Sequence, residues 1–325
     1  MLAVAEHLDT VNLPHDRTVI EGILDRSVRS FAGELSGADL EFVFVLEDLA
    51  AKRIIGTSMI YAQHGTKRAP HIFFRVENDE RYSVTLDRYF VHRTLRIGYN
   101  YNGPTEIGGL ILLPEYRRNA HALGKALSYV RFLFMRMHRP VFRNQVLSEL
   151  LPPLEPDGTS KLWEALGKRF TGLTYQEADR LSKDNKEFIH ALFPDDPIHT
   201  ELLPEDVQAL IGQVGEDTRA VEKMLRRIGF DYAEQIDPFD GGPHFIANTD
   251  DITVVRDARE VEVRAGSEGG GKWAILAVET PGARPQFRSV GARVAPLEQG
   301  AVALSEDCRS RLGVEVGQKV WLSFG

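Results

Sequence analysis

The sequence predicts a fold of the mixed α/β or α+β class, and two observations carry this prediction. First, residues 41–48 (EFVFVLED) and 53–62 (RIIGTSMIYA) are rich in β-branched and aromatic residues. A short polar turn separates them, which is typical of paired antiparallel strands. Second, apolar residues recur at helical spacing before and after these strands. Strands and helices that are interleaved along a chain favour a sheet covered by helices.

The spacing of apolar residues and the positions of glycine and proline predict the remaining elements in order. They are a helix at 19–32, strands at 41–48, 53–62, 71–76, 86–97 and 106–113, a long helix at 122–138, a strand at 146–150, helices at 160–168, 175–182, 185–192, 204–213 and 218–228, and strands at 230–236 and 245–255. The charged run ENDERY at 77–82 is predicted to be a turn between two of these strands.

The character of the chain changes after residue 258. The glycine-rich stretch at 266–271 indicates a hairpin tip or a flexible joint, and short β-like runs follow to residue 324. We therefore predict one domain at 1–258, which includes a helical insert at about 155–228, and a small β-rich C-terminal domain at 259–325. The second domain is expected to be a separable unit.

The composition argues against several classes of binding partner and of cellular location. A net charge of −8 argues against binding to nucleic acid or to an anionic membrane, which requires clustered basic surface. One cysteine, Cys308, cannot form an internal disulfide, so a reducing compartment is expected. Apolar runs are far shorter than a bilayer, and the first residues do not resemble a secretion signal. We expect a cytoplasmic protein.

The segment at 106–134 (EIGGLILLPEYRRNAHALGKALSYVRFLF) predicts a buried strand, a loop and then a helix. The free N–H groups and the dipole at a helix start attract phosphate groups. Arg117 and Arg118 would add charge, while Ala120, Ala122 and Gly124 would let a pyrophosphate approach the backbone closely. Taken alone, this pattern is equally compatible with a surface loop that carries two solvated arginines.

The motif R-x-x-A-x-A at 117–122 resembles the pyrophosphate loop of acyl-CoA-binding acetyltransferases of the GNAT type. Longer stretches resemble the arginine N-succinyltransferase family, in that family's order. They are RSVRSFAGEL, FVFVLEDLAAKRIIGTSMI, ILLPEYRR, LSYVRFLF, LWEALGKRF, FIHALFPDDPI, VQALIGQV, IGFDY, DPFDGGP and LGVEVGQKV. The resemblance implies an α+β fold of the GNAT-like kind, with a mixed, mostly antiparallel sheet flanked by helices and a small β-rich C-terminal appendage.

The resemblance also implies an activity. The family transfers succinyl from succinyl-CoA to the α-amine of arginine in arginine catabolism, so acyl-CoA is a co-substrate and no cofactor is bound permanently. Leu110 falls where the family contacts succinyl-CoA. The implied partners are therefore an acyl-CoA and arginine, together with a second copy of the chain or a related subunit.

The sequence departs from the family at the proton donor. Where the family has G-Q-V-H, this chain ends the motif with Gly215. Candidate groups for the proton transfer are Glu106, Glu149, His199 and His244. We select Glu106, beside the predicted acyl-CoA strand, and His244, which follows the D-G-G-P loop. The competing interpretation of Glu106 is an ordinary ion pair or helix cap, and that of His244 is a loop histidine without a catalytic role.

Two further expectations concern the same departure. A Gly215→His substitution is expected to raise activity if the surrounding family geometry has survived. No metal site is expected, because the ten histidines show neither H-x-x-x-H nor H-E-x-x-H spacing.

Two other functions stay open at this point. The chain could be a catalytically weakened homologue that binds CoA or arginine and regulates an active succinyltransferase, since the family histidine is missing. It could also be a GNAT acyltransferase for a different amine, because residues 81–103, where the acceptor pocket is expected, differ from the family pattern.

Overall fold

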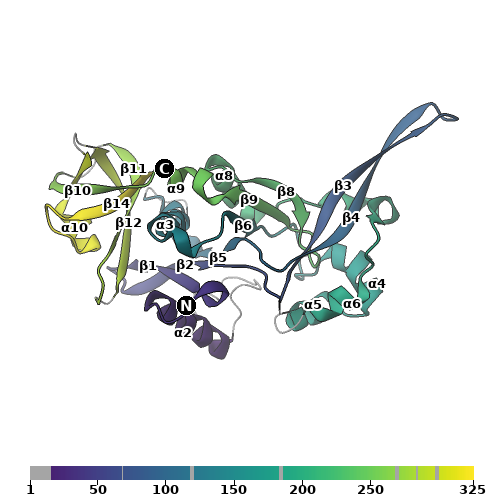
Figure 1. The fold of residues 1–325 in the computed structure, drawn as a ribbon, viewed down its shortest axis with the longest axis horizontal. Coiled ribbons are helices and arrows are strands. Elements are labelled where there is room, and N and C mark those ends of the chain that lie inside the picture. Colours follow the sequence, from purple (N-terminus) through teal and green to yellow (C-terminus); the bar gives the residue numbers. More distant parts are fainter. Residues whose placement is uncertain are drawn as a thin grey trace. The chain divides into compact units, whose positions relative to one another are not determined.

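The computed structural model describes residues 16–67, 69–117, 121–182, 186–267, 271–282, 285–296 and 300–325 (Figure 1). The predicted α+β class is confirmed, with antiparallel strands flanked by helices and a closed β-barrel near the C-terminus. The chain divides into two compact units. Unit 1 comprises Met1–Ala62, Thr105–Asn144 and Asn248–Gly325, and unit 2 comprises Gln63–Pro104 and Gln145–Ala247.

Unit 1 is built on three antiparallel strands in the order β1-β2-β5. Its elements outside the barrel are α2 (Arg17–Phe31), η1 (Gly37–Asp39), β1 (Glu41–Asp48), β2 (Arg53–Tyr61), β5 (Thr105–Leu112), η2 (Pro114–Tyr116), α3 (Leu123–Met137), η3 (Arg139–Val141), η7 (Thr249–Asp251) and α9 (Thr253–Arg256). Helix α2 begins after Asp16, whose carboxylate accepts hydrogen bonds from two N–H groups of the first turn. Its buried Ile20 and Ile23 pack in one cluster with residues of β2 and β5.

The barrel of unit 1 contains five strands in the order β10-β13-β12-β11-β14. They are β10 (Arg259–Ala265), β11 (Lys272–Glu279), β12 (Phe287–Pro296), β13 (Ala301–Leu304) and β14 (Lys319–Phe324). Helix α10 (Glu306–Leu312) was not predicted, although its end signals are in the sequence. Ser305 caps its start by accepting from the N–H of Cys308 at 3.2 Å, and Gly313 ends it at φ 71°.

Unit 2 has strands in the order β6-β9-β8-β3-β4-β7. Its strands are β3 (His71–Ser83), β4 (Arg88–Asn100), β6 (Gln145–Glu149), β7 (Ile198–His199), β8 (Asp231–Ile236) and β9 (Pro243–Asn248). Its helical elements are the π-helix η4 (Trp163–Gly167), α4 (Lys168–Thr171), α5 (Tyr175–Ser182), α6 (Glu187–Leu192), η5 (Thr200–Leu202), α7 (Glu205–Leu210), η6 (Glu216–Thr218) and α8 (Arg219–Arg227). Trp163 is fully buried in its core and stacks on Phe239 at 5.0 Å.

The predicted turn at 77–82 was wrong, because these residues belong to β3. Strands β3 and β4 pair without interruption from His71↔Asn100 to Ser83↔Arg88, and the turn lies at 84–87. The end of this hairpin is largely exposed, as the long ribbon in Figure 1 shows, so its charged side chains need no buried face. Some pair with one another instead, as Arg81 does with Asp79 at 2.6 Å.

The predicted strand at 245–255 was also too long. Strand β9 ends at Asn248, and η7 and α9 follow. The hydroxyl of Thr249 donates to the carbonyl of Arg143 at 2.6 Å, and the Asn248 amide donates to Asp251 at 3.1 Å. Short polar side chains of this kind compete with strand pairing and favour turns.

None of the helices in the described part of the chain is long and apolar enough to cross a membrane.

The predicted domain boundary between residues 258 and 259 stays a prediction. The barrel is closed, yet within unit 1 one of its residues joins the core of the sheet and helices. The ring of Phe287 lies 5.5 Å from that of Phe44 and 5.3 Å from that of Phe134. Phe31 lies 6.5 Å away. These aromatic contacts bury apolar surface that would be open to water without the barrel.

We therefore expect Phe287→Ala to lower the free energy of unfolding by about 2–3 kcal/mol, less than a fully buried phenylalanine because its ring is half-buried. Urea denaturation followed by circular dichroism measures this. Tyr89→Ala, at a side chain that is 79% exposed, is the control and should change stability by less than about 0.5 kcal/mol. Equal effects of the two substitutions would show that the barrel does not contribute to the unit 1 core.

Candidate active site

Strand β5 is interrupted by a bulge at the position where the sequence predicts an acyl-CoA contact. The paired positions on either side of the break are Met59↔Gly108 and Thr57↔Ile111. Gly109 and Leu110 therefore lie opposite a single residue of β2. An extra residue of this kind leaves a local break in the ladder and bends the strand.

Gly109 is required for this bulge. Its φ of 55° is in the left-handed region, and a Cβ there would lie 2.6 Å from the sulfur of Met59. The hydroxyl of Thr57 donates to the carbonyl of Gly109 at 3.0 Å and fixes the turned peptide. The geometry places Leu110 in the bulge.

A buried arginine on α3 holds the bulged strand. Arg131 is only 2% exposed. Its guanidinium donates to the carbonyl of Gly108 at 3.3 Å, to the carbonyl of Ser128 at 3.1 Å and to the Ser128 hydroxyl at 2.9 Å. Burial lowers the pKa of Arg131 to about 9, so the group is still a cation at neutral pH.

The start of α3 has the features that an anion site requires. Ala122, just before the helix, adopts the left-handed conformation at φ 52° and offers no side chain to cap the first N–H groups. Gly124 is the second helical residue. Arg117 is tied to the end of β5, because its Nε donates to the carbonyl of Leu112 at 2.9 Å. Two other predicted residues, Arg118 and Ala120, lie outside the described residues.

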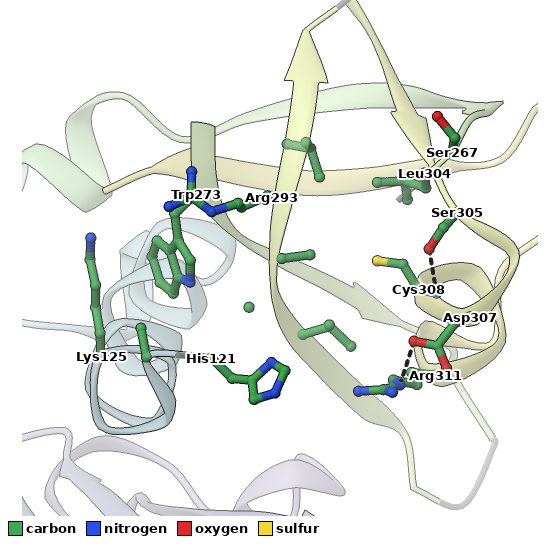
Figure 2. A pocket seen from close by; sticks show the side chains of 15 residues that line it. His121, Lys125, Ser267, Trp273, Arg293, Leu304, Ser305, Asp307, Cys308 and Arg311 are labelled. Carbon is green, nitrogen blue, oxygen red and sulfur yellow. Dashed lines mark hydrogen bonds and ion pairs between the residues drawn. The ribbon is translucent and has the colours of Figure 1, made fainter. Parts of the chain in front are cut away.

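A cavity of about 560 Å³ opens beside the start of α3 (Figure 2). His121, Ala122 and Lys125 line it from the helix side, and Trp273 and residues of β12 and α10 line it from the barrel. The ammonium of Lys125 lies 4.3 Å from the centre of a Trp273 ring. Arg293 is a second cation of the lining. Cys308 also lines the cavity and is buried, as a small apolar side chain would be.

Comparison with known proteins decides the family. The family model described as "Arginine N-succinyltransferase beta subunit" matches residues 1–254. A protein of Escherichia coli (strain 55989 / EAEC) named arginine N-succinyltransferase is 31% identical over 296 residues, which cover 91% of this chain and 85% of that protein. The chain belongs to the arginine N-succinyltransferase family.

Two further members show the same relationship. A Yersinia pestis (strain Pestoides F) protein with the same name is 34% identical over 248 residues, which cover 76% of this chain and 70% of that protein. The solved structure of arginine/ornithine succinyltransferase subunit AI from Pseudomonas aeruginosa has a TM-score of 0.84 and 28% identity. It covers 99% of this chain and 94% of that chain.

Among the predicted site residues, Glu106 lies in unit 1 with the residues predicted to bind acyl-CoA, whereas His244 lies in unit 2. Glu106 is 5% exposed on β5 and is in register with Tyr61 of β2. Burial raises the pKa of Tyr61, and the nearby carboxylates of Glu41 and Glu106 add to the shift. The catalytic role of Glu106 stays a prediction.

His244 lies in a cluster of imidazoles around one carboxylate in unit 2. Oε1 of Glu149 is 3.3 Å from Nε2 of His71, 3.4 Å from Nε2 of His244 and 4.0 Å from Nε2 of His64. Asp237 offers a second carboxylate within the same group. Sequence reasoning missed His64, His71 and Asp237. The signal was a histidine that opens an apolar strand, at His71-Ile72-Phe73-Phe74.

The charges of this cluster depend on burial. His244 is completely buried, and burial lowers its pKa to about 3 although the carboxylate of Glu149 opposes the shift. Burial works against the ionisation of Glu149, but the imidazoles outweigh it and hold its pKa well below the usual range. Burial and then the charge of Glu149 raise the pKa of Asp237 to about 6. The imidazole of His244 is therefore neutral beside the ionised carboxylate of Glu149.

The other candidate, His199, lies elsewhere in unit 2 and is largely exposed. Its Nδ1 is 3.9 Å from Glu201, and Nδ1 of His92 is 3.6 Å from the same carboxylate.

A side chain at position 215 would meet neighbouring backbone atoms. A Cβ at this position would lie 2.7 Å from the carbonyl oxygen of Pro152 and 3.0 Å from that of Leu151. The N–H of Gly215 donates to the carbonyl of Leu151 at 2.8 Å, which fixes the close approach. The backbone of residues 151–152 would therefore have to shift to accept any side chain at position 215, and the expected gain in activity from Gly215→His stays a prediction.

The bulge generates a prediction about two glycines. Gly109→Ala should lower the free energy of unfolding by about 1–3 kcal/mol, because alanine is strained at a positive φ and meets Met59. Gly124→Ala is the matched control, since its Cβ would meet only Leu112 at 3.8 Å and alanine is the better helix former. Thermal or urea unfolding of both variants measures the difference. A Gly109→Ala variant as stable as Gly124→Ala would contradict the bulge.

Proposed function

We propose that this protein is an arginine N-succinyltransferase, which transfers the succinyl group of succinyl-CoA to the α-amine of arginine in arginine catabolism. The observation that carries the proposal is the match to the family over residues 1–254, which includes the bulged strand and the start of α3. No specific observation favours either alternative function, the regulatory homologue or the acyltransferase for another amine.

The reaction makes one bond and breaks one. The neutral α-amine attacks the thioester carbonyl, a C–N bond forms, the C–S bond breaks, and the CoA sulfur leaves and accepts a proton. A backbone N–H aimed at the carbonyl oxygen stabilises the negative charge that develops there. Leu110, in the bulge of β5, is our candidate for this donor.

The CoA phosphates would lie at the start of α3. Arg117, Arg118, Ala120, Ala122 and Gly124 are the residues that we assign to them. The helix N–H groups and the arginines supply positive charge, while the small side chains allow close approach. The cavity that begins at His121 and Ala122 gives room for the nucleotide end of the same ligand.

At higher pH the α-amine of arginine is already neutral, so no dedicated base is needed to remove its proton. An α-amine has a pKa of about 8 or higher, so its neutral form costs on the order of 1–2 kcal/mol at pH 7. Glu106 is our candidate for accepting the proton, because it lies on the same strand as Leu110. The role of His244 as a base stays a prediction.

The protein is proposed to act in an assembly. The family model is described as a beta subunit, and the Pseudomonas aeruginosa relative is called subunit AI. A second copy or a related subunit is therefore the expected partner.

Turnover measurement tests the proposed function. Release of free CoA thiol from succinyl-CoA should require arginine, and other amino acids and acetyl-CoA should give lower kcat/KM. The rate should rise with pH as the α-amine loses its proton. A preference for another amine, or CoA binding without turnover over the whole pH range, would contradict the proposal.

Arginine 117 tests the CoA site separately. Arg117→Ala should weaken succinyl-CoA binding by about 10- to 100-fold, as the loss of one charge-assisted contact of about 1.5–3 kcal/mol predicts. Arg117→Ala/Arg118→Ala should weaken it further. Arg53→Ala is the control, since Arg53 pairs with Glu115 at 2.8 Å in the same loop region. Calorimetry that gives wild-type affinity for the folded Arg117 variants would contradict this assignment.

A further inference from the structure

We propose that Glu149, Asp237 and His244 bind a divalent transition-metal ion of the zinc class in unit 2, with Nε2 of His71 close to the same carboxylate of Glu149. The two sets of possible ligands, His64-His71-Glu149 and Glu149-Asp237-His244, share Glu149, and within each set the ligand atoms lie within 4.8 Å of one another. The proposal does not depend on the proposed enzymatic function.

The ligand atoms are close enough for a tetrahedral ion. Zinc binds imidazole nitrogen at about 2.0–2.1 Å and carboxylate oxygen at about 2.0–2.2 Å, so neighbouring ligand atoms lie about 3.3–3.5 Å apart. Oε1 of Glu149 is already 3.4 Å from Nε2 of His244. The carboxylate of Asp237 lies within 4.8 Å of the other two ligand atoms and would move closer when the ion binds.

The burial of His244 is the second argument. Its side chain has no exposed surface, and neither of its ring nitrogens has a hydrogen-bond partner. A buried polar group without a partner costs about 1–3 kcal/mol, and a metal ion at Nε2 would remove part of this cost. Nε2 faces the carboxylate of Glu149, which is the only anionic ligand shared by the two sets.

Rigid elements hold these ligands. Glu149 is the last residue of β6, Asp237 directly follows β8, and His244 is the second residue of β9. The imidazoles of His71 and His244 stack with centres 5.2 Å apart, and the rings of His64 and His71 are 4.6 Å apart. Ligands on strands keep their positions without the ion, which favours binding because little order has to be created.

One histidine with two carboxylates is a ligand set that zinc accepts, and three protein ligands leave a fourth position for water. The prediction of no metal site rested on short spacings along the sequence. The structure instead brings together histidines and carboxylates from distant parts of the chain, which no spacing rule detects. Ligation at Nε2 would also remove His244 from the role of a base.

Unit 2 contains a second group of possible ligands that serves as a control for the proposed metal site. His92, His199 and Glu201 are also within metal-binding reach of one another, but they are largely exposed at side-chain exposures of 37%, 46% and 39%. Exposed groups of this kind are common on protein surfaces without an ion.

The test measures metal content and affinity. The full-length protein, stripped with a chelator and then loaded with zinc chloride, should retain one zinc per chain after gel filtration, as measured by mass spectrometry of the metal. His244→Ala should weaken zinc binding by more than tenfold in competition with a chromophoric chelator, since even changes beside ligands cost about 10- to 100-fold. His199→Ala should leave zinc affinity and stoichiometry unchanged.

Glu149→Gln keeps the shape of the side chain and covers the case in which His244→Ala fails to fold. It should lose zinc while retaining the far-ultraviolet circular dichroism spectrum of the wild type. Cobalt in place of zinc should give the visible absorption of a tetrahedral site, and Glu149→Gln should remove it. The absence of bound zinc in the wild type, or its loss in His199→Ala but not in Glu149→Gln, would overturn the proposal. An active succinyltransferase that binds no zinc would leave the proposed function intact and overturn this site alone.

Discussion

A buried guanidinium connects the bulged strand of this protein to the helix that follows it. Arg131 is fully enclosed in unit 1, where water cannot solvate its charge, so its hydrogen bonds to Ser128 and Gly108 must compensate. One of these bonds reaches the peptide that precedes Gly109. These bonds therefore hold the bulge and helix α3 together, and both the proposed carbonyl site at Leu110 and the proposed anion site at Ala122 depend on this connection.

The two proposed sites of the chain differ in their physical basis. The proposed acyl-CoA site in unit 1 would use backbone groups at a left-handed glycine and at a helix start without a side-chain cap. The proposed metal site in unit 2 would use side chains, including a His244 imidazole that burial keeps neutral beside Glu149. The family match, which covers the bulged strand and the loop, supports the first proposal. The second proposal rests on the three-dimensional arrangement of the segments around β6, β8 and β9.

Most of the fold could be predicted from the sequence because its elements follow local rules. Strand β1 and helix α5 lie where apolar spacing predicts them, and α3 differs by one residue at each end. The errors have physical causes. The run at 77–82 is a strand without a buried face, so alternation gave no signal there. Thr249 and Asp251 end β9 through side-chain hydrogen bonds, and helix α10 is too short for its apolar period to be seen. For the site, spacing could indicate the loop at Arg117, but it could not indicate the approach of His64, His71 and His244, which tertiary structure alone creates.

Hydrogen exchange tests most directly whether the bulge and the helix start form the acyl-CoA site. With saturating CoA, the amides of Leu110 and of the first turn of α3, Leu123 to Lys125, should exchange more slowly than in the free protein, because the ligand would accept their hydrogen bonds. The amides of the exposed hairpin tip at 84–87 serve as the internal reference and should not change. Protection confined to other segments, with Leu110 and the start of α3 unaffected, would contradict the placement of the acyl-CoA site.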